Sequence, residues 1–122
     1  MLILGIDPGL QKTGWGIVFS HGNSLQYRAS GTIKTDPDEN LAERLAHLHR
    51  EISAIIQQWQ PDEAAVEETF INKNAASALK LGQARGVALC APAVQGIPVS
   101  EYSANKIKKS VVGTGHADKT QI

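Results

Sequence analysis

The chain has 122 residues, a length that suits one domain with a single hydrophobic core. Its 12 basic and 12 acidic residues give a formal net charge of +0, so a nucleic-acid binder would need its basic surface in a local cluster. No apolar stretch is long enough to span a bilayer, and the single cysteine, Cys90, excludes an internal disulfide. These properties predict an ordinary globular protein of the reducing cytoplasm, with no membrane partner and with Cys90 as a small buried hydrophobic residue.

The first third of the chain has the pattern of strands. An apolar run over residues 2–6 ends at Asp7-Pro8-Gly9, which is typical of a buried strand that leads into a turn. A second strand is predicted over 13–20, and two shorter strand-like pieces follow over 25–29 and 31–35. The sequence therefore opens as an antiparallel meander.

The pattern then changes to a helical one. Apolar residues recur at steps of four and three between Leu41 and Trp59, so they form one face of a helix, which Pro61 ends. This helix separates the meander from the rest of the chain.

Strands and helices alternate in the second half. A short strand is predicted over 64–66, a helix over about 74–91 and a fifth strand over 97–99. Ser103 is placed to cap a third helix. Strands first, then alternating helices and strands, predict an α/β fold with a mixed five-stranded sheet and helices packed on it.

Two carboxylates follow predicted strands. Asp7 ends the first strand, and Glu67 directly follows the strand over 64–66. If these strands are neighbours, both carboxylates project from the sheet edge at which ligands gather in α/β folds. Close carboxylates repel each other, and a hard cation such as Mg²⁺ relieves that repulsion. The alternatives are that Asp7 caps the turn through its side chain and that Glu67 is a solvated residue at a strand end.

Residues that could contact nucleic acid lie mostly in the second half of the chain. Phe70, in a predicted loop, could stack on a base, or it packs into the core. Lys80 and Arg85 could add to a basic patch from the second helix, a patch that is either a solvated helix face or a surface for DNA phosphates. The patch itself consists of four lysines, Lys106, Lys108, Lys109 and Lys119.

Several of these segments resemble a known family. Gly5-Ile6-Asp7-Pro8-Gly9 is similar to the first motif of RuvC-type Holliday junction resolvases, and Val66-Glu67-Glu68-Thr69-Phe70 resembles their second acidic motif. The run from Asn74 to Gly86 is nearly their signature helix, which is a highly specific match. The resemblance covers the whole chain.

The resemblance implies a single ribonuclease-H-like domain over residues 1–122 and a homodimer. The implied activity is that of an endonuclease that resolves four-way DNA junctions by paired nicks in recombination and repair, with Mg²⁺ or Mn²⁺. Asp7 and Glu67 match two of the four catalytic acids that hold the metal. Phe70 matches an aromatic residue that packs against junction bases, and Lys108 and Lys119 match lysines that contact DNA. Docking of branch-migration helicase proteins is a further partnership that the resemblance leaves open.

The resemblance also marks a departure. In the family two further aspartates lie on a C-terminal helix, and Asp118 matches neither of them. The sequence therefore predicts a domain without that helix, which is inactive or nearly so. Three alternatives stay open: a fragment that binds junctions without cutting them, an RNA-processing nuclease that shares the Asp-Pro-Gly opening, and a phosphotransferase of the sugar-kinase and actin-like type, for which the chain is short.

Overall fold

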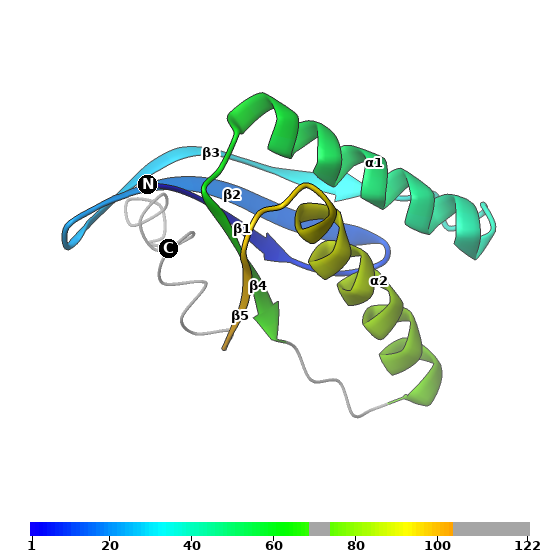
Figure 1. Ribbon diagram of the computed structural model, residues 1–122. Helices are drawn as coiled ribbons and strands as arrows, with labels where there is room; N and C mark the ends of the chain where they lie inside the picture. The colour runs from blue at the N-terminus through cyan, green and yellow to red at the C-terminus, as the bar shows by residue number, and fades with distance from the viewer. Residues whose placement is uncertain (69–73, 104–122) are drawn as a thin grey trace.

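The structure is a computed structural model that describes residues 1–68 and 74–103. These residues form one five-stranded sheet with two helices on the same face (Figure 1). Across the sheet the strands follow the order β3-β2-β1-β4-β5. Their bounds are β1 Leu2–Asp7, β2 Lys12–His21, β3 Ser24–Lys34, β4 Glu63–Glu68 and β5 Val99–Ser103.

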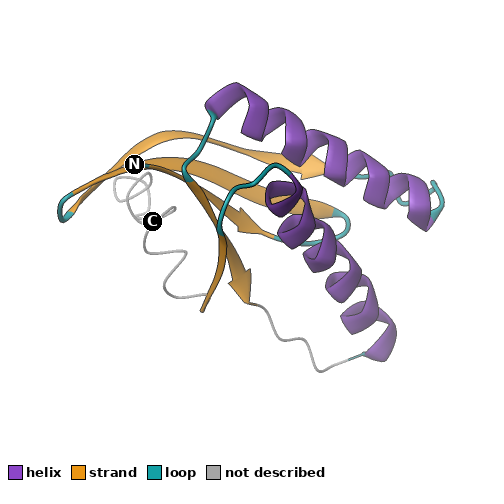
Figure 2. Cartoon of the chain, in the orientation of Figure 1, coloured by secondary structure: helices purple, strands orange, loops and turns teal. Residues whose placement is uncertain are grey.

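The sheet is mixed, as the sequence predicts. β1, β2 and β3 form an antiparallel meander, whereas β4 runs parallel to β1 and β5 runs parallel to β4. Helix α1 (Leu41–Trp59) connects the meander to β4, and helix α2 (Ala75–Val94) connects β4 to β5, as Figure 2 shows. No helix in the described part of the chain is long and apolar enough to cross a membrane.

Local signals set the ends of the helices. The Asn40 side chain accepts a hydrogen bond from the Glu43 amide at 2.9 Å and so caps the start of α1. Helix α1 ends at Gln60, which adopts a left-handed conformation with φ 51° before Pro61. Asn74 caps α2 in the same way by accepting from the amides of Ala76 and Ser77. The predicted helices are therefore confirmed, although α2 continues three residues past Ala91 to Val94.

Three predictions about local structure were wrong. The two pieces predicted at 25–29 and 31–35 are one strand, β3. Its pairing with β2 is interrupted by a β-bulge, in which Arg28 is the extra residue. The last strand begins at Val99, not at Ile97. Cys90 is exposed, because the buried residues of α2 lie on another side of that helix. The helix predicted after Ser103 lies outside the described residues.

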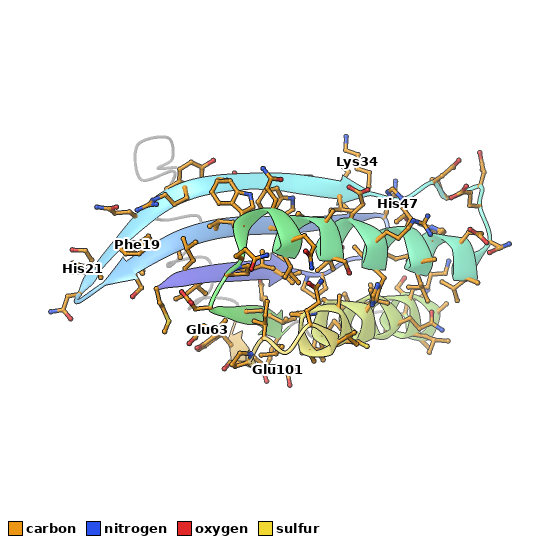
Figure 3. All side chains as sticks on the ribbon, turned by 45° about the horizontal axis from the view of Figure 1, so that its top comes forward. Phe19, His21, Lys34, His47, Glu63 and Glu101 are labelled. Atoms are coloured by element: carbon orange, nitrogen blue, oxygen red, sulfur yellow. The ribbon has the colours of Figure 1, made fainter. Side chains whose placement is uncertain are left out.

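The bulge has a packing consequence at the far tip of the β2–β3 hairpin. The Arg28 guanidinium lies 4.8 Å from the centre of the Phe19 ring, and Phe19 stacks with His21 at 6.3 Å between ring centres. Figure 3 shows Phe19 and His21 at this tip, beyond the helices. The extra residue thus places the Arg28 guanidinium over the half-buried Phe19, which stacks with the exposed His21 at the end of β2 opposite to Asp7.

The hydrophobic core fills the space between the helices and one face of the sheet. Every second residue of the inner strands points into it, and so do the residues of α1 that recur at three and four positions. The completely or almost completely buried members of this core are Leu4, Ile6, Ile17, Leu48, Ile52, Ile56, Ala64, Val66, Ala84, Ala88 and Ala91.

Candidate active site

The alternation of side chains along β1 and β4 determines where the two predicted acids point. Because Leu4 and Ile6 face the helices, Asp7 belongs to the opposite face of the sheet. In β4, Val66 belongs to the same core, so Glu67 also belongs to the opposite face. Both acids therefore project from one face.

The register brings these acids side by side. β1 and β4 are parallel neighbours, and Ile6 pairs with Val66, so Asp7 and Glu67 occupy the next position on each strand. Neighbouring strands lie about 4.8 Å apart, which is close enough for one cation to reach both carboxylates. The structure thus meets the condition that the sequence left open, namely that the two strands are neighbours.

The surroundings of the two acids argue against the alternatives that Asp7 caps the turn and that Glu67 is a solvated residue at a strand end. Glu67 is only 4% exposed, so it is not a solvated residue at a strand end. Asp7 is exposed, and within the described residues its carboxylate accepts no hydrogen bond, so it does not cap the turn. The hydroxyl of Thr13 closes that turn instead, by donating to the Gly9 carbonyl at 2.6 Å.

Gly14 keeps space open beside Asp7. It is the β2 partner of Asp7, and a Cβ at Gly14 would lie 3.8 Å from the Asp7 Cβ, where there is now only hydrogen. On the other side of Glu67, Tyr102 of β5 is its register partner and shares its face of the sheet. Local sequence patterns do not predict this position of Tyr102, because only the parallel pairing of β5 with β4 places it there.

The donor set suits a hard divalent cation. In the described ranges no three His, Cys, Asp or Glu side chains gather as a complete metal cage. Mg²⁺ needs less than such a cage, because it is commonly held by one or two carboxylates together with waters and phosphate oxygens. Asp7 and Glu67 therefore fit a cation that a phosphate backbone would help to coordinate.

The predicted DNA-contacting residues are placed only in part. Lys80 is exposed on the first half of α2. Arg85, whose side chain is 21% exposed, forms an ion pair with Glu101 of β5 and so ties α2 to the edge of the sheet. Phe70, Lys108 and Lys119 lie outside the described residues.

Comparison with known proteins assigns the chain to a family. The family model described as "Crossover junction endodeoxyribonuclease RuvC" matches residues 3–122. The chain belongs to the RuvC family. Members of this family are hydrolases that act on DNA at Holliday junctions, and they depend on a metal.

Individual RuvC proteins agree with this assignment. The chain is 57% identical to the crossover junction endodeoxyribonuclease RuvC of Rhizobium johnstonii over 120 residues, which cover 98% of this chain and 71% of that protein. It is 56% identical to the protein of the same name from Agrobacterium fabrum, with the same coverage. Among solved structures, it resembles T. thermophilus RuvC in complex with a Holliday junction substrate, with a TM-score of 0.80 and 31% identity over 89% of this chain and 70% of that one.

The RuvC match also decides between the alternatives. It confirms the ribonuclease-H-like fold and the resolvase family that the motifs predict. It argues against an RNA-processing nuclease and against a phosphotransferase, because family and structure both agree with a junction resolvase over nearly the whole chain.

Proposed function

We propose that Asp7 and Glu67 are catalytic acids of this RuvC-family domain and hold Mg²⁺ where a strand of a four-way DNA junction is cut. The observation that supports this most directly is their placement in register, on one face of the sheet, at the carboxyl ends of two parallel strands. The exposure of Asp7 leaves it accessible to DNA, whereas the burial of Glu67 holds it rigidly.

The proposed reaction is hydrolysis of a phosphodiester. When bound, divalent cations activate a water molecule and stabilise the leaving 3′ oxygen. Asp7 and Glu67 would hold the cations, and Gly14 would leave room for the DNA backbone beside Asp7. Mn²⁺, which accepts similar oxygen ligands, is expected to replace Mg²⁺.

Binding of the metal by Asp7 and Glu67 can be measured separately from cleavage of DNA. The test is to titrate Mn²⁺ and follow its paramagnetic resonance signal, with junction binding and nicking measured in parallel. Glu67→Gln should weaken Mn²⁺ binding at least tenfold. Glu68→Gln is the matched control, because Glu68 is the next residue of β4 and belongs to the opposite face of the sheet. Equal affinities for the two variants would refute the site.

We also propose that DNA is held by Lys80, Arg85, Phe70, Lys108 and Lys119. Cationic side chains release counterions when they neutralise phosphates, so each contact steepens the salt dependence of binding. The exposed Lys80 offers the simplest test, because Lys80→Gln should reduce the slope of log affinity against log salt concentration by about one. An unchanged slope would remove Lys80 from the interface.

A homodimer is the proposed assembly, because two symmetric copies would make paired nicks. One side of α2 supports this: it carries the 63% exposed Leu79 and the exposed Cys90, and both Gly82 and Gly86 would have nothing within 4 Å of an added Cβ. These residues carry no charge, and the glycines let a second helix approach closely. Equilibrium sedimentation tests it, because Gly86→Arg should weaken self-association.

The matched control for the dimer is Ala42→Arg, which adds the same charge at an exposed position of the other helix, α1. Self-association that survives Gly86→Arg unchanged would place the dimer interface elsewhere. If the protein binds junctions but never nicks them, even with Mn²⁺ bound, the non-catalytic alternative holds.

Because the proposed substrate is chromosomal DNA, we propose that the protein acts in the cytoplasm. Docking of helicase proteins can be tested by direct binding measurements.

A further inference from the structure

The loop between β1 and β2, residues 8–11, directly follows Asp7 and is held by hydrogen bonds to its backbone. The Thr13 hydroxyl donates to the Gly9 carbonyl at 2.6 Å and accepts from the Gly9 amide at 3.2 Å. The Thr35 hydroxyl donates to the Leu10 carbonyl at 2.7 Å, and the Thr35 amide donates to the Gln11 carbonyl at 3.1 Å. Three consecutive carbonyls of this loop therefore have protein donors.

Thr35 is itself held by a buried arginine. Arg44 of α1 is 8% exposed, and its Nε donates to the Thr35 hydroxyl oxygen at 3.0 Å. In the part of the chain that the structure describes, no carboxylate lies within 4.0 Å of the Arg44 guanidinium. In Figure 3 this region is marked by Lys34, the residue before Thr35, and by His47, which is one turn after Arg44.

The chemistry of these groups determines which one donates and which one accepts in each hydrogen bond. A guanidinium can only donate hydrogen bonds, so the Thr35 oxygen must accept from Arg44, and the hydroxyl proton is left for the Leu10 carbonyl. A positively charged donor polarises the hydroxyl and strengthens the second hydrogen bond. Burial of the charged Arg44 guanidinium is costly unless it forms hydrogen bonds, so breaking its bond to Thr35 is unfavourable.

Asp7 depends on this support more than a buried ligand would. Its carboxylate accepts no hydrogen bond within the described residues, so no neighbouring side chain there fixes its direction. Its position is instead determined by the backbone of β1 on one side and by the loop over 8–11 on the other. A ligand has to be placed within about half an ångström to hold a metal well.

We infer that Thr35 and Arg44 are positioning residues for Asp7: through the Leu10 carbonyl they hold the β1–β2 loop and thereby set the direction of the Asp7 carboxylate. This inference rests on the proposed function, in which Asp7 holds the metal. It assigns a role to Thr35, which directly follows β3, and to Arg44 of α1. Both lie far from Asp7 in the sequence and belong to neither acidic motif.

The experiment compares Thr35→Val with Thr35→Ser in the metal-free and Mn²⁺-loaded protein. Valine keeps the shape of threonine but has no hydroxyl, whereas serine keeps the hydroxyl. Thr35→Val should weaken Mn²⁺ binding about tenfold, the lower end of the effect of losing a direct outer partner of a metal ligand, because Thr35 acts on Asp7 through the loop. It should also speed hydrogen exchange at the backbone amides of the loop, and Thr35→Ser should restore both properties.

Two further variants keep the inference falsifiable. Arg44→Lys keeps the charge but not the Nε donor, and should weaken Mn²⁺ binding in the same direction as Thr35→Val. Ile52→Val is the control on the same helix, because Ile52 is 1% exposed in the core and its loss of a methylene lowers stability without touching the loop. It should lower the melting temperature and leave the Mn²⁺ affinity unchanged.

The outcomes separate this inference from the proposed function. If the wild-type chain does not bind Mn²⁺, or if Asp7→Asn binds it as well as the wild type, the metal site is refuted and the inference falls with it. If Asp7→Asn loses Mn²⁺ binding but Thr35→Val and Arg44→Lys keep the wild-type affinity, the metal site stands and only the positioning role is overturned. A drop in affinity for Ile52→Val equal to that for Thr35→Val would also overturn it.

Discussion

Gly9, in the loop that follows Asp7, is the position at which a single methyl group should do most damage. A Cβ added at Gly9 would lie 2.4 Å from the Lys12 carbonyl oxygen, which is backbone and cannot swing away. Ordinary contacts lie at about 3.5 Å, so the backbone of the loop would have to move by roughly 1 Å in Gly9→Ala.

The expected cost follows from this displacement. Overpacking of this kind costs about 1–3 kcal/mol, and the weakened hydrogen bonds between Gly9 and the Thr13 hydroxyl would add about 1 kcal/mol. We therefore expect the free energy of unfolding to fall by about 2–4 kcal/mol in urea titrations followed by tryptophan fluorescence. Mn²⁺ binding should weaken as well, because the loop positions Asp7.

The matched control for Gly9→Ala is Gly82→Ala, measured at a concentration at which the chain is monomeric. Nothing lies within 4 Å of a Cβ at Gly82, in the middle of α2, so alanine should raise stability there by about 0.5–1 kcal/mol. The reasoning is refuted if Gly9→Ala loses less than about 0.5 kcal/mol, or if the same change at Gly82 costs as much.

Two further predictions concern the C-terminal end of α1 and the contact between α2 and β5. Gln60 closes α1 in a left-handed conformation at φ 51°, so Gln60→Gly should raise the free energy of unfolding by about 0.5–1 kcal/mol despite losing the side-chain bond to the Gln57 carbonyl, and a lower melting temperature would contradict this. The ion pair between Arg85 and Glu101 is partly exposed, with side chains 21% and 43% accessible, so a double-mutant cycle with alanine should give a coupling of about 0.2–1 kcal/mol that shrinks in high salt. A coupling above about 2 kcal/mol would show that the pair does more than hold α2 against β5.

Much of the sheet could be read from local patterns. The apolar run of β1 and the spacing of apolar residues in α1 are properties of a few neighbouring residues, and they agree with the structure. The asparagines before both helices acted as caps, also within one turn of chain. The single strand β3 was predicted as two pieces that part at Ser30, because only the pairing of Ser30 with Gly16 of β2 shows that the strand continues there.

The hydrogen bonds that join Arg44, Thr35 and Leu10 could not be predicted from local patterns. Arg44 is buried in α1, although the apolar spacing of that helix does not include it and arginine is almost never buried without a partner. Its burial depends on Thr35 and Leu10, which come from other elements. The prediction that Cys90 is buried was wrong because an apolar run does not indicate which of its residues will face the sheet.

For the two acids, the sequence by itself determined that each lies near the end of a strand and, through its motifs, which family the chain belongs to. Only the tertiary structure decided that they stand side by side, since β1 and β4 lie about half the chain apart and pair when α1, which connects the meander to β4, packs on the sheet. It also decided that Glu67 is buried while Asp7 is exposed. The physical reason is that local periodicity sets the direction of a side chain relative to its own strand, whereas register and burial arise only when distant elements pack together.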